Sequence, residues 1–178
     1  LIIISSTLST ILISKQFFSN VIYANTVRDF QSGADLLTID NGLKRSQDLS
    51  KQDIFVSERA QIRLAELNKL NAEDPATVDQ QRFATVLSEG ISLAEQAVLL
   101  DSTNPANYIL LTNFYGLLNP ADFEGLKERN ETLFARAREL DSSNPAYLLS
   151  MAQYMARIGD LEATRKYLQE AITIKNDY

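Results

Sequence analysis

The chain has 178 residues and a formal net charge of −6, from 17 Lys and Arg against 23 Asp and Glu. This acidic balance argues against a nucleic-acid partner, because binding to phosphates requires clustered Lys and Arg. The sequence has no His and no Cys, which excludes His-dependent triads, disulfides, thiolate nucleophiles and zinc–thiolate sites.

Residues 1–25 form a hydrophobic N-terminal segment. Its first fourteen residues include eight large aliphatic side chains and no charge, the first charge being Lys15. Burial of each such side chain is worth about 1.5–3 kcal/mol, so exposing all eight would forfeit roughly the 5–15 kcal/mol net stability of a typical domain. We therefore expect a second body to cover this segment. The expected contact residues are Leu1, Ile2, Ile3, Ile4, Leu8, Ile11, Leu12, Ile13, Phe17 and Phe18.

Three environments could cover the segment. A cleaved signal peptide would need a basic n-region, which is absent, and Val21–Ala24 is only a weak cleavage site. A membrane helix, using residues 1–24, needs about 20 apolar residues, although a sequence that starts at Leu rather than Met would fit the remnant of a longer span. The third environment is an identical copy of the chain, and this is the partner we expect. Ile and Thr are frequent here, so either a helix or a strand would suit that contact.

Helical periodicity begins near residue 26. Residues 26–52 fit half of a degraded helical unit, with Gly33 at its turn. The leucines expected to be buried in this unit are Leu36, Leu37, Leu43 and Leu49.

Residues 54–101 fit a second, divergent unit. The pattern predicts a helix over Val56–Leu70, a break at Asn71–Pro75 and a long helix over about Ala76–Leu100. The expected apolar face of the long helix comprises Phe83, Val86, Leu87, Ile91, Ala94, Ala97 and Val98.

A repeat organises the rest of the chain into units 104–143 and 144–178. The seven residues Leu100–Ala106 recur forty residues later as Leu140–Ala146. In both copies an Asn is expected to cap a helix and the following Pro to take its first position. Gly159 and Asp160 are expected to form the turn between the two helices of the last unit.

Apolar residues recur within these units at spacings of three and four. In the last unit they are Leu148, Met151, Ala152 and Met155, then Thr164, Leu168, Ala171 and Ile172. The unit before it has Tyr108, Leu111, Thr112 and Tyr115, then Asn130, Phe134 and Ala137. This pattern resembles the tetratricopeptide repeat family, whose repeat is 34 residues long. Asn130 and Thr164 depart from it, because they stand where the family prefers Ala.

The resemblance implies an all-α, tetratricopeptide-like solenoid of helical hairpins that binds proteins in a concave groove. The implied groove residues are Ile109, Leu110, Asn113, Leu117, Leu149, Ser150, Gln153 and Arg157. With its hydrophobic N-terminal segment, the chain also loosely resembles the tail of bacterial O-antigen-ligase-like membrane proteins, in which a last membrane helix runs into such repeats. That second resemblance assigns no catalytic residue to this chain.

Signals of catalysis are weak. The six glycines are too scattered for a phosphate-binding loop, and the sequence has no G-x-S-x-G or S-x-x-K motif. The acidic pairs Glu73–Asp74 and Asp122 with Glu124 fit helix caps and solvated faces better than a carboxylate-dependent enzyme. We therefore expect no catalytic, cofactor or metal site.

Two functions remain open. The first is a non-enzymatic structural protein, extracellular or at the cell surface, that assembles into a filament through the N-terminal segment and the open ends of the solenoid. The alternative is a membrane-tethered interaction module with its repeats outside the membrane, for which the second resemblance implies the C-terminal part of an envelope glycopolymer ligase-like protein.

Overall fold

The computed structural model describes residues 2–72, 79–119 and 122–176, and the side chains within these ranges except those of residues 2–9 and 176. The described residues form eight helices and no strand, so the expected all-α class is confirmed. The chain divides into two compact units, Leu1–Leu100 and Asp101–Tyr178. The first contains α1 (Ile2–Gln31), α2 (Leu36–Leu49), α3 (Asp53–Asn71) and α4 (Gln80–Leu100). The second contains α5 (Pro105–Tyr115), α6 (Leu126–Leu140), α7 (Pro145–Arg157) and α8 (Leu161–Asn176).

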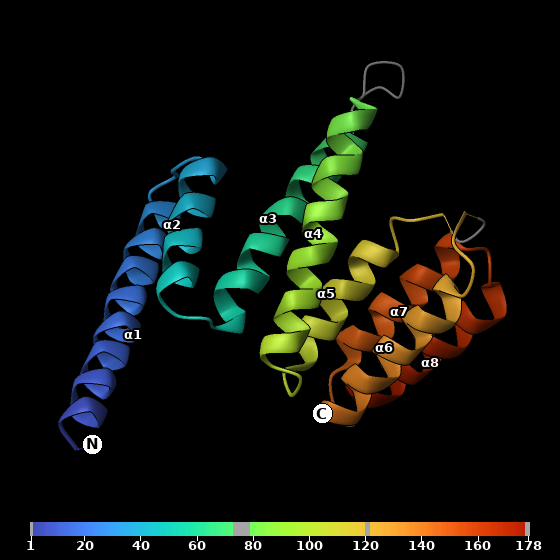
Figure 1. Cartoon of the computed structure of the whole chain (residues 1–178). Coiled ribbons are helices and arrows are strands. Elements are labelled where there is room, and N and C mark those ends of the chain that lie inside the picture. The colour runs from blue at the N-terminus through green and yellow to red at the C-terminus, as the bar shows by residue number, and fades with distance from the viewer. Residues whose placement is uncertain (1, 73–78, 120–121, 177–178) are drawn as a thin grey trace. The chain divides into compact units, whose positions relative to one another are not determined.

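Helices that follow one another in the chain pack as pairs: α1 with α2, α3 with α4, α5 with α6 and α7 with α8 (Figure 1). Residues 2–14 are helical, which decides between the helix and strand alternatives for this segment; Leu1 lies outside the described residues. The boundary expected near residue 25 is not a break in structure, because α1 continues without interruption to Gln31. The turn after α1 is at Gly33, as expected, with a φ of +84° that glycine adopts without strain.

Small residues hold α1 close to α2. The Ser19 hydroxyl donates to the Ser46 carbonyl over 2.7 Å, and Gly42 faces Thr26 so closely that a Cβ at Gly42 would lie 2.1 Å from the Thr26 hydroxyl oxygen. This contact involves only the second half of α1. The first half extends beyond the end of α2 (Figure 1).

The expected burial of leucines on α2 is partly wrong. Leu43 is buried and Leu49 is half-buried, but Leu36 and Leu37 are exposed. The buried face of α2 runs through Ile39, Leu43 and Ser46, at the spacing of four and three that one helical face requires. Leu37 lies off that face, and Leu36 lies on the first turn of the helix, at the edge of a pocket described below.

The α3–α4 pair matches the expected second unit closely. α3 begins at Asp53 and ends at Asn71, against the expected Val56–Leu70, and α4 is described from Gln80. The expected break at Asn71–Pro75 falls largely on residues 73–78, which lie outside the described residues. All seven residues of the expected apolar face of α4 are buried or half-buried.

An ion-pair network joins α2, α3 and α4. The carboxylate of Asp40, which is only 6% exposed, accepts from Arg59 over 2.9 Å and from Arg63 over 2.8 Å. Arg63 also contacts Glu89 on α4 over 3.0 Å. The network therefore holds α2 and α4 against α3 through charge as well as apolar packing.

In the second unit, the repeated Asn-Pro pairs act as predicted. Asn104 accepts from the amide of Ala106 and Asn144 from that of Ala146, both over 3.1 Å. Pro105 and Pro145 begin α5 and α7. At the turn before α8, Gly159 has a φ of +83°, and Asp160 caps the helix through the amide of Ala163.

The apolar stripes of the second unit are buried on α5, α6 and α7 but not on α8. Every expected stripe residue on the first three helices is buried, including Asn130. On α8 the expected stripe is incompletely covered, since Thr164 and Ala171 are half-buried while Leu168 and Ile172 are exposed. The reason is that α8 packs on α7, which covers one side of its apolar surface.

Candidate functional site

A group of exposed apolar side chains in the described part of the first unit lies on α1, beginning ahead of the Ser19 contact with α2. We call it the apolar surface of α1. Its side chains are between 40% and 68% exposed. They are Ile11, Leu12, Ile13, Phe17, Phe18 and Val21. The other expected contact residues, Leu1, Ile2, Ile3, Ile4 and Leu8, have side chains outside the described residues.

The apolar surface is wide but does not surround the helix. Successive residues of an α-helix are rotated by about 100°, so Ile11, Leu12 and Ile13 alone point in directions that span roughly 200°. Phe17 and Phe18 follow one to two turns later, and their rings contact each other with centroids 5.7 Å apart.

This portion of α1 also has a polar side. The exposed side chains of Lys15, Gln16 and Asn20 point in directions between those of Ile11 and Ile13.

Polar contacts with the rest of the unit begin before the apolar surface ends. Ser19 donates to the Ser46 carbonyl, and Asn20 accepts a hydrogen bond from Gln52 over 3.3 Å. Tyr23 contacts Phe55 with ring centroids 5.2 Å apart and donates from its hydroxyl to Glu58 over 2.6 Å. The apolar surface therefore overlaps at Val21 with the part of α1 that packs in the folded unit.

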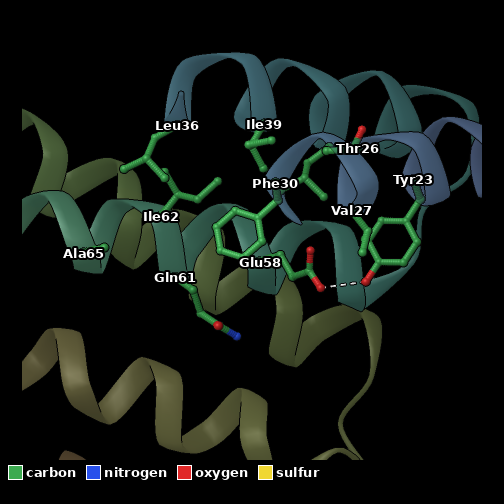
Figure 2. A pocket seen from close by; sticks show the side chains of 11 residues that line it. Tyr23, Thr26, Val27, Phe30, Leu36, Ile39, Glu58, Gln61, Ile62 and Ala65 are labelled. Carbon is green, nitrogen blue, oxygen red and sulfur yellow. Dashed lines mark hydrogen bonds between the residues drawn. The ribbon is translucent and has the colours of Figure 1, made fainter. Parts of the chain in front are cut away.

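A pocket lies between α1, α2 and α3, with a volume of about 400 Å³ (Figure 2). Ten of its eleven lining side chains are uncharged and the eleventh is Glu58. The lining residues are Tyr23, Thr26, Val27, Phe30, Leu36, Ile39, Leu43, Glu58, Gln61, Ile62 and Ala65. Burial, together with the Glu58 carboxylate, raises the pKa of Tyr23 to about 12, so its hydroxyl remains a hydrogen-bond donor at neutral pH.

Sequence reasoning missed this pocket. Tyr23, Thr26 and Phe30 are spaced by three and four residues, the signal of a common helical face. The domain boundary expected at residue 25 assigns Tyr23 to the N-terminal segment and Thr26 and Phe30 to the first repeat, so the three residues are not recognised as one helical face.

The expected groove residues lie on α5, α7 and the turn after α5. Asn113, Leu149, Gln153 and Arg157 are exposed, and Ile109, Leu117 and Ser150 are half-buried. Leu110 is buried, so it belongs to the core and its expected groove role is wrong. Arg157 is already engaged, because its guanidinium donates to the Gly116 carbonyl. The structure thus brings seven of the eight residues to accessible positions on neighbouring helices.

Neither a metal site nor an obvious membrane span is found in the described part of the chain. No group of three or more His, Cys, Asp or Glu residues there could hold a metal ion. Among the residues whose side chains the structure describes, which do not include residues 2–9 of α1, the helix long and apolar enough to cross a membrane is α4. However, α4 buries its apolar face against α3, and its Glu89 is paired with Arg63, as in the core helix of a folded unit.

Comparison with known proteins does not identify the chain. Neither protein-family models nor curated proteins give a match to its sequence. Any function must therefore be argued from the residues and their geometry.

Proposed function

We propose that the chain is a membrane-anchored protein-interaction module, with the first half of α1 in a lipid bilayer and tetratricopeptide-like helical hairpins outside it. The observation that carries this proposal is the apolar surface of α1, on which Ile11, Leu12, Ile13, Phe17 and Phe18 are exposed. The first three of these residues lie near the end of a stretch of fourteen residues without a charge. A bilayer is an environment that would cover such side chains.

The length of the helix supports this proposal. The seventeen residues from Ile2 to Phe18 are continuously helical and span about 25 Å at 1.5 Å per residue, near the roughly 30 Å of a bilayer core. The one charge among them, Lys15, lies near the end of this stretch, where a long side chain can extend its ammonium group to the interface. Tyr23 follows at the position of an interfacial aromatic residue.

The interaction role rests on the second unit. Its two hairpins share the Asn-Pro caps and a glycine with positive φ before the second helix, and the apolar stripes of α5, α6 and α7 are buried, a pattern that resembles tetratricopeptide repeats. Leu149 and Leu117 give the accessible face of α5 and α7 an apolar character, and Arg157 is its cation. A protein partner with an apolar segment is the class that suits this face.

Vesicle flotation of the full chain tests the anchor. We expect the chain to float with phosphatidylcholine vesicles and a variant carrying Ile11→Lys, Leu12→Lys and Ile13→Lys to stay behind, since each charge inside a bilayer costs about 2.5–3.5 kcal/mol. The matched control carries Leu161→Lys and Ile172→Lys, which replace exposed apolar residues on α8, and should float like the unmodified chain. Equal flotation of both variants, or none by the unmodified chain, would overturn the proposal.

Self-assembly is the second candidate, because α8 carries another uncovered apolar patch, formed by Leu161, Leu168 and Ile172. Contact between two different patches is head-to-tail and tends to propagate as a filament. This candidate expects filaments by negative-stain microscopy in the absence of lipid, and their loss in both the α1 and the α8 lysine variants. The anchor proposal expects only the α1 variant to differ from the unmodified chain.

A further inference from the structure

We propose that the pocket between α1, α2 and α3 binds a small amphiphilic amine, whose apolar body fills the pocket and whose ammonium group pairs with Glu58. The proposal concerns the folded part of the first unit. It does not depend on whether the first half of α1 lies in a bilayer.

The walls of the pocket suit an apolar body. Val27, Ile39 and Ile62 contribute branched side chains from three different helices, and the Phe30 ring projects into the space between them (Figure 2). Phe30 is 60% exposed, so a ligand would cover an aromatic ring that the protein leaves in water. The volume of about 400 Å³ lies within the range of roughly 300–1,000 Å³ that is usual for small-molecule sites.

The charge of the pocket indicates which head group the ligand carries. Among the described residues, Glu58 has one hydrogen-bond partner, the Tyr23 hydroxyl, and takes part in no ion pair. The nearest arginines in sequence, Arg59 and Arg63, pair instead with Asp40. The pocket therefore presents a carboxylate without a counter-charge beside an apolar cavity. A cationic ligand would supply that counter-charge.

The hydrogen-bond acceptors of the pocket also suit an ammonium head group. Tyr23 donates to one carboxylate oxygen of Glu58, which leaves the second oxygen of Glu58 to accept from a ligand. The phenolic oxygen of Tyr23 can accept as well. An ammonium group has three donors for such acceptors, whereas a carboxylate or phosphate head group would be repelled by Glu58. The face of the Phe30 ring offers a further favourable contact for a cation.

The size of the pocket favours a small molecule over a peptide helix. A helix with its side chains is about 10–12 Å across and needs a groove several turns long. The pocket is a partly open hollow between three helices of one unit, and it is limited to eleven lining residues. We therefore assign the site to a compact ligand rather than to a lysine presented by a partner protein.

Three probes of matched shape test the proposal: cyclohexylmethylamine, cyclohexylmethanol and cyclohexanecarboxylate. The full chain in non-ionic detergent, with labelled isoleucine methyl groups, is titrated at pH 7 and followed by NMR at Ile39 and Ile62. We expect the amine to bind at least tenfold more tightly than the carboxylate, with the alcohol between them. Equal affinities, or no shift of either methyl group with the amine, would overturn the proposal.

Substitutions then locate the site. Glu58→Gln should lower the affinity for the amine to that for the alcohol and leave the alcohol unchanged, while Glu66→Gln, the same charge change on α3, should alter neither. Ile62→Trp should fill the pocket and abolish binding of all three probes. If Glu58→Gln does not fold, this variant still tests whether the probes bind in the pocket. An amine preference that survives in Glu58→Gln would contradict the assignment, as would an amphipathic lysine peptide that shifts these methyl groups when the amine does not.

Discussion

The two units are held together by different means. In the second unit, local signals dominate: Asn-Pro caps start α5 and α7, and apolar stripes at spacings of three and four are buried. In the first unit, buried polar contacts also join the helices, such as Ser19 with Ser46 and Asp40 with Arg63. The ion pairs between helices of the second unit, such as Lys127 with Asp160, lie nearer the surface. The contrast teaches that helical pairs of similar appearance can differ in how much of their packing depends on buried polar partners.

The largest test of this contrast is Asp40→Ala in the first unit. Removing the carboxylate leaves Arg59 and Arg63 without the partner that holds α2 against α3, and breaking such a buried pair costs about 3–5 kcal/mol. We expect a loss of stability near the lower figure, because Arg63 keeps Glu89. Chemical denaturation gives the size of the loss. Hydrogen exchange should show that the loss of stability is confined to the first unit. A loss shared equally by both units would contradict the difference between the two units.

A second test is Gly42→Ala, at the close approach of α1 and α2. The new Cβ would lie 2.1 Å from the Thr26 hydroxyl oxygen, and forcing such a contact costs about 1–3 kcal/mol. Adding Thr26→Ala should recover much of the loss, because it removes the two closest atoms. Thermal denaturation of the single and double variants measures both effects. A double variant no better than the single one would place the strain elsewhere.

The local character of the second unit is tested by Asn144→Ala. The substitution removes the side chain that accepts from the Ala146 amide, and loss of such a cap typically costs about 1 kcal/mol. Asn144→Asp, which keeps an acceptor at the cap, is the matched control and should retain stability. Urea denaturation of both variants provides the comparison, and equal losses would show that the cap is not what matters at this position.

A gain in stability is expected from Asn130→Ala on α6. Asn130 is fully buried, and neither polar atom of its amide makes a hydrogen bond of good geometry, although the buried Tyr154 hydroxyl is its polar neighbour. Leaving a buried polar group unsatisfied costs about 1–3 kcal/mol, which outweighs the small cavity that Ala leaves, so we expect a gain of about 1 kcal/mol. Denaturant midpoints of the two proteins give this difference. A loss would mean that the amide is satisfied in solution by ordered water.

A last expected effect is at alkaline pH and concerns Tyr23. The pKa of Tyr23 is raised from 10.0 to about 12 in the folded state, so folding favours the protonated phenol. Its contribution is fully present below pH 10 and is lost as the pH rises from 10 towards 12. Tyr23→Phe should flatten this part of the stability profile of the first unit. Denaturation at pH 8, 10 and 11.5 measures it, and an unchanged slope in Tyr23→Phe would contradict the assignment.

Sequence reasoning succeeded where a contact is local. The caps at Asn104 and Asn144, the turns at Gly33 and Gly159 and the buried face of α4 were predicted from neighbouring residues alone. Hydrophobic periodicity of this kind is set by the geometry of a single helix.

It failed where partners are distant in the chain. The Asp40 network could not be found, because the sequence does not say which charged faces meet. The pocket was lost when a change of composition near residue 25 was read as a boundary, although the backbone of α1 is continuous there. Leu36 and Leu37 show that a leucine does not by itself predict burial, because only one face of α2 is covered.

The continuity of α1 has a mechanical consequence. Ile11 lies on the apolar surface, and Phe30, in the pocket wall, follows nineteen residues later on the same helix, about 28 Å along its axis. Because the helix is not interrupted between the two residues, a change in its tilt near Ile11 would also move Phe30. The shape of the cavity is thereby coupled to the orientation of the helix in its surroundings.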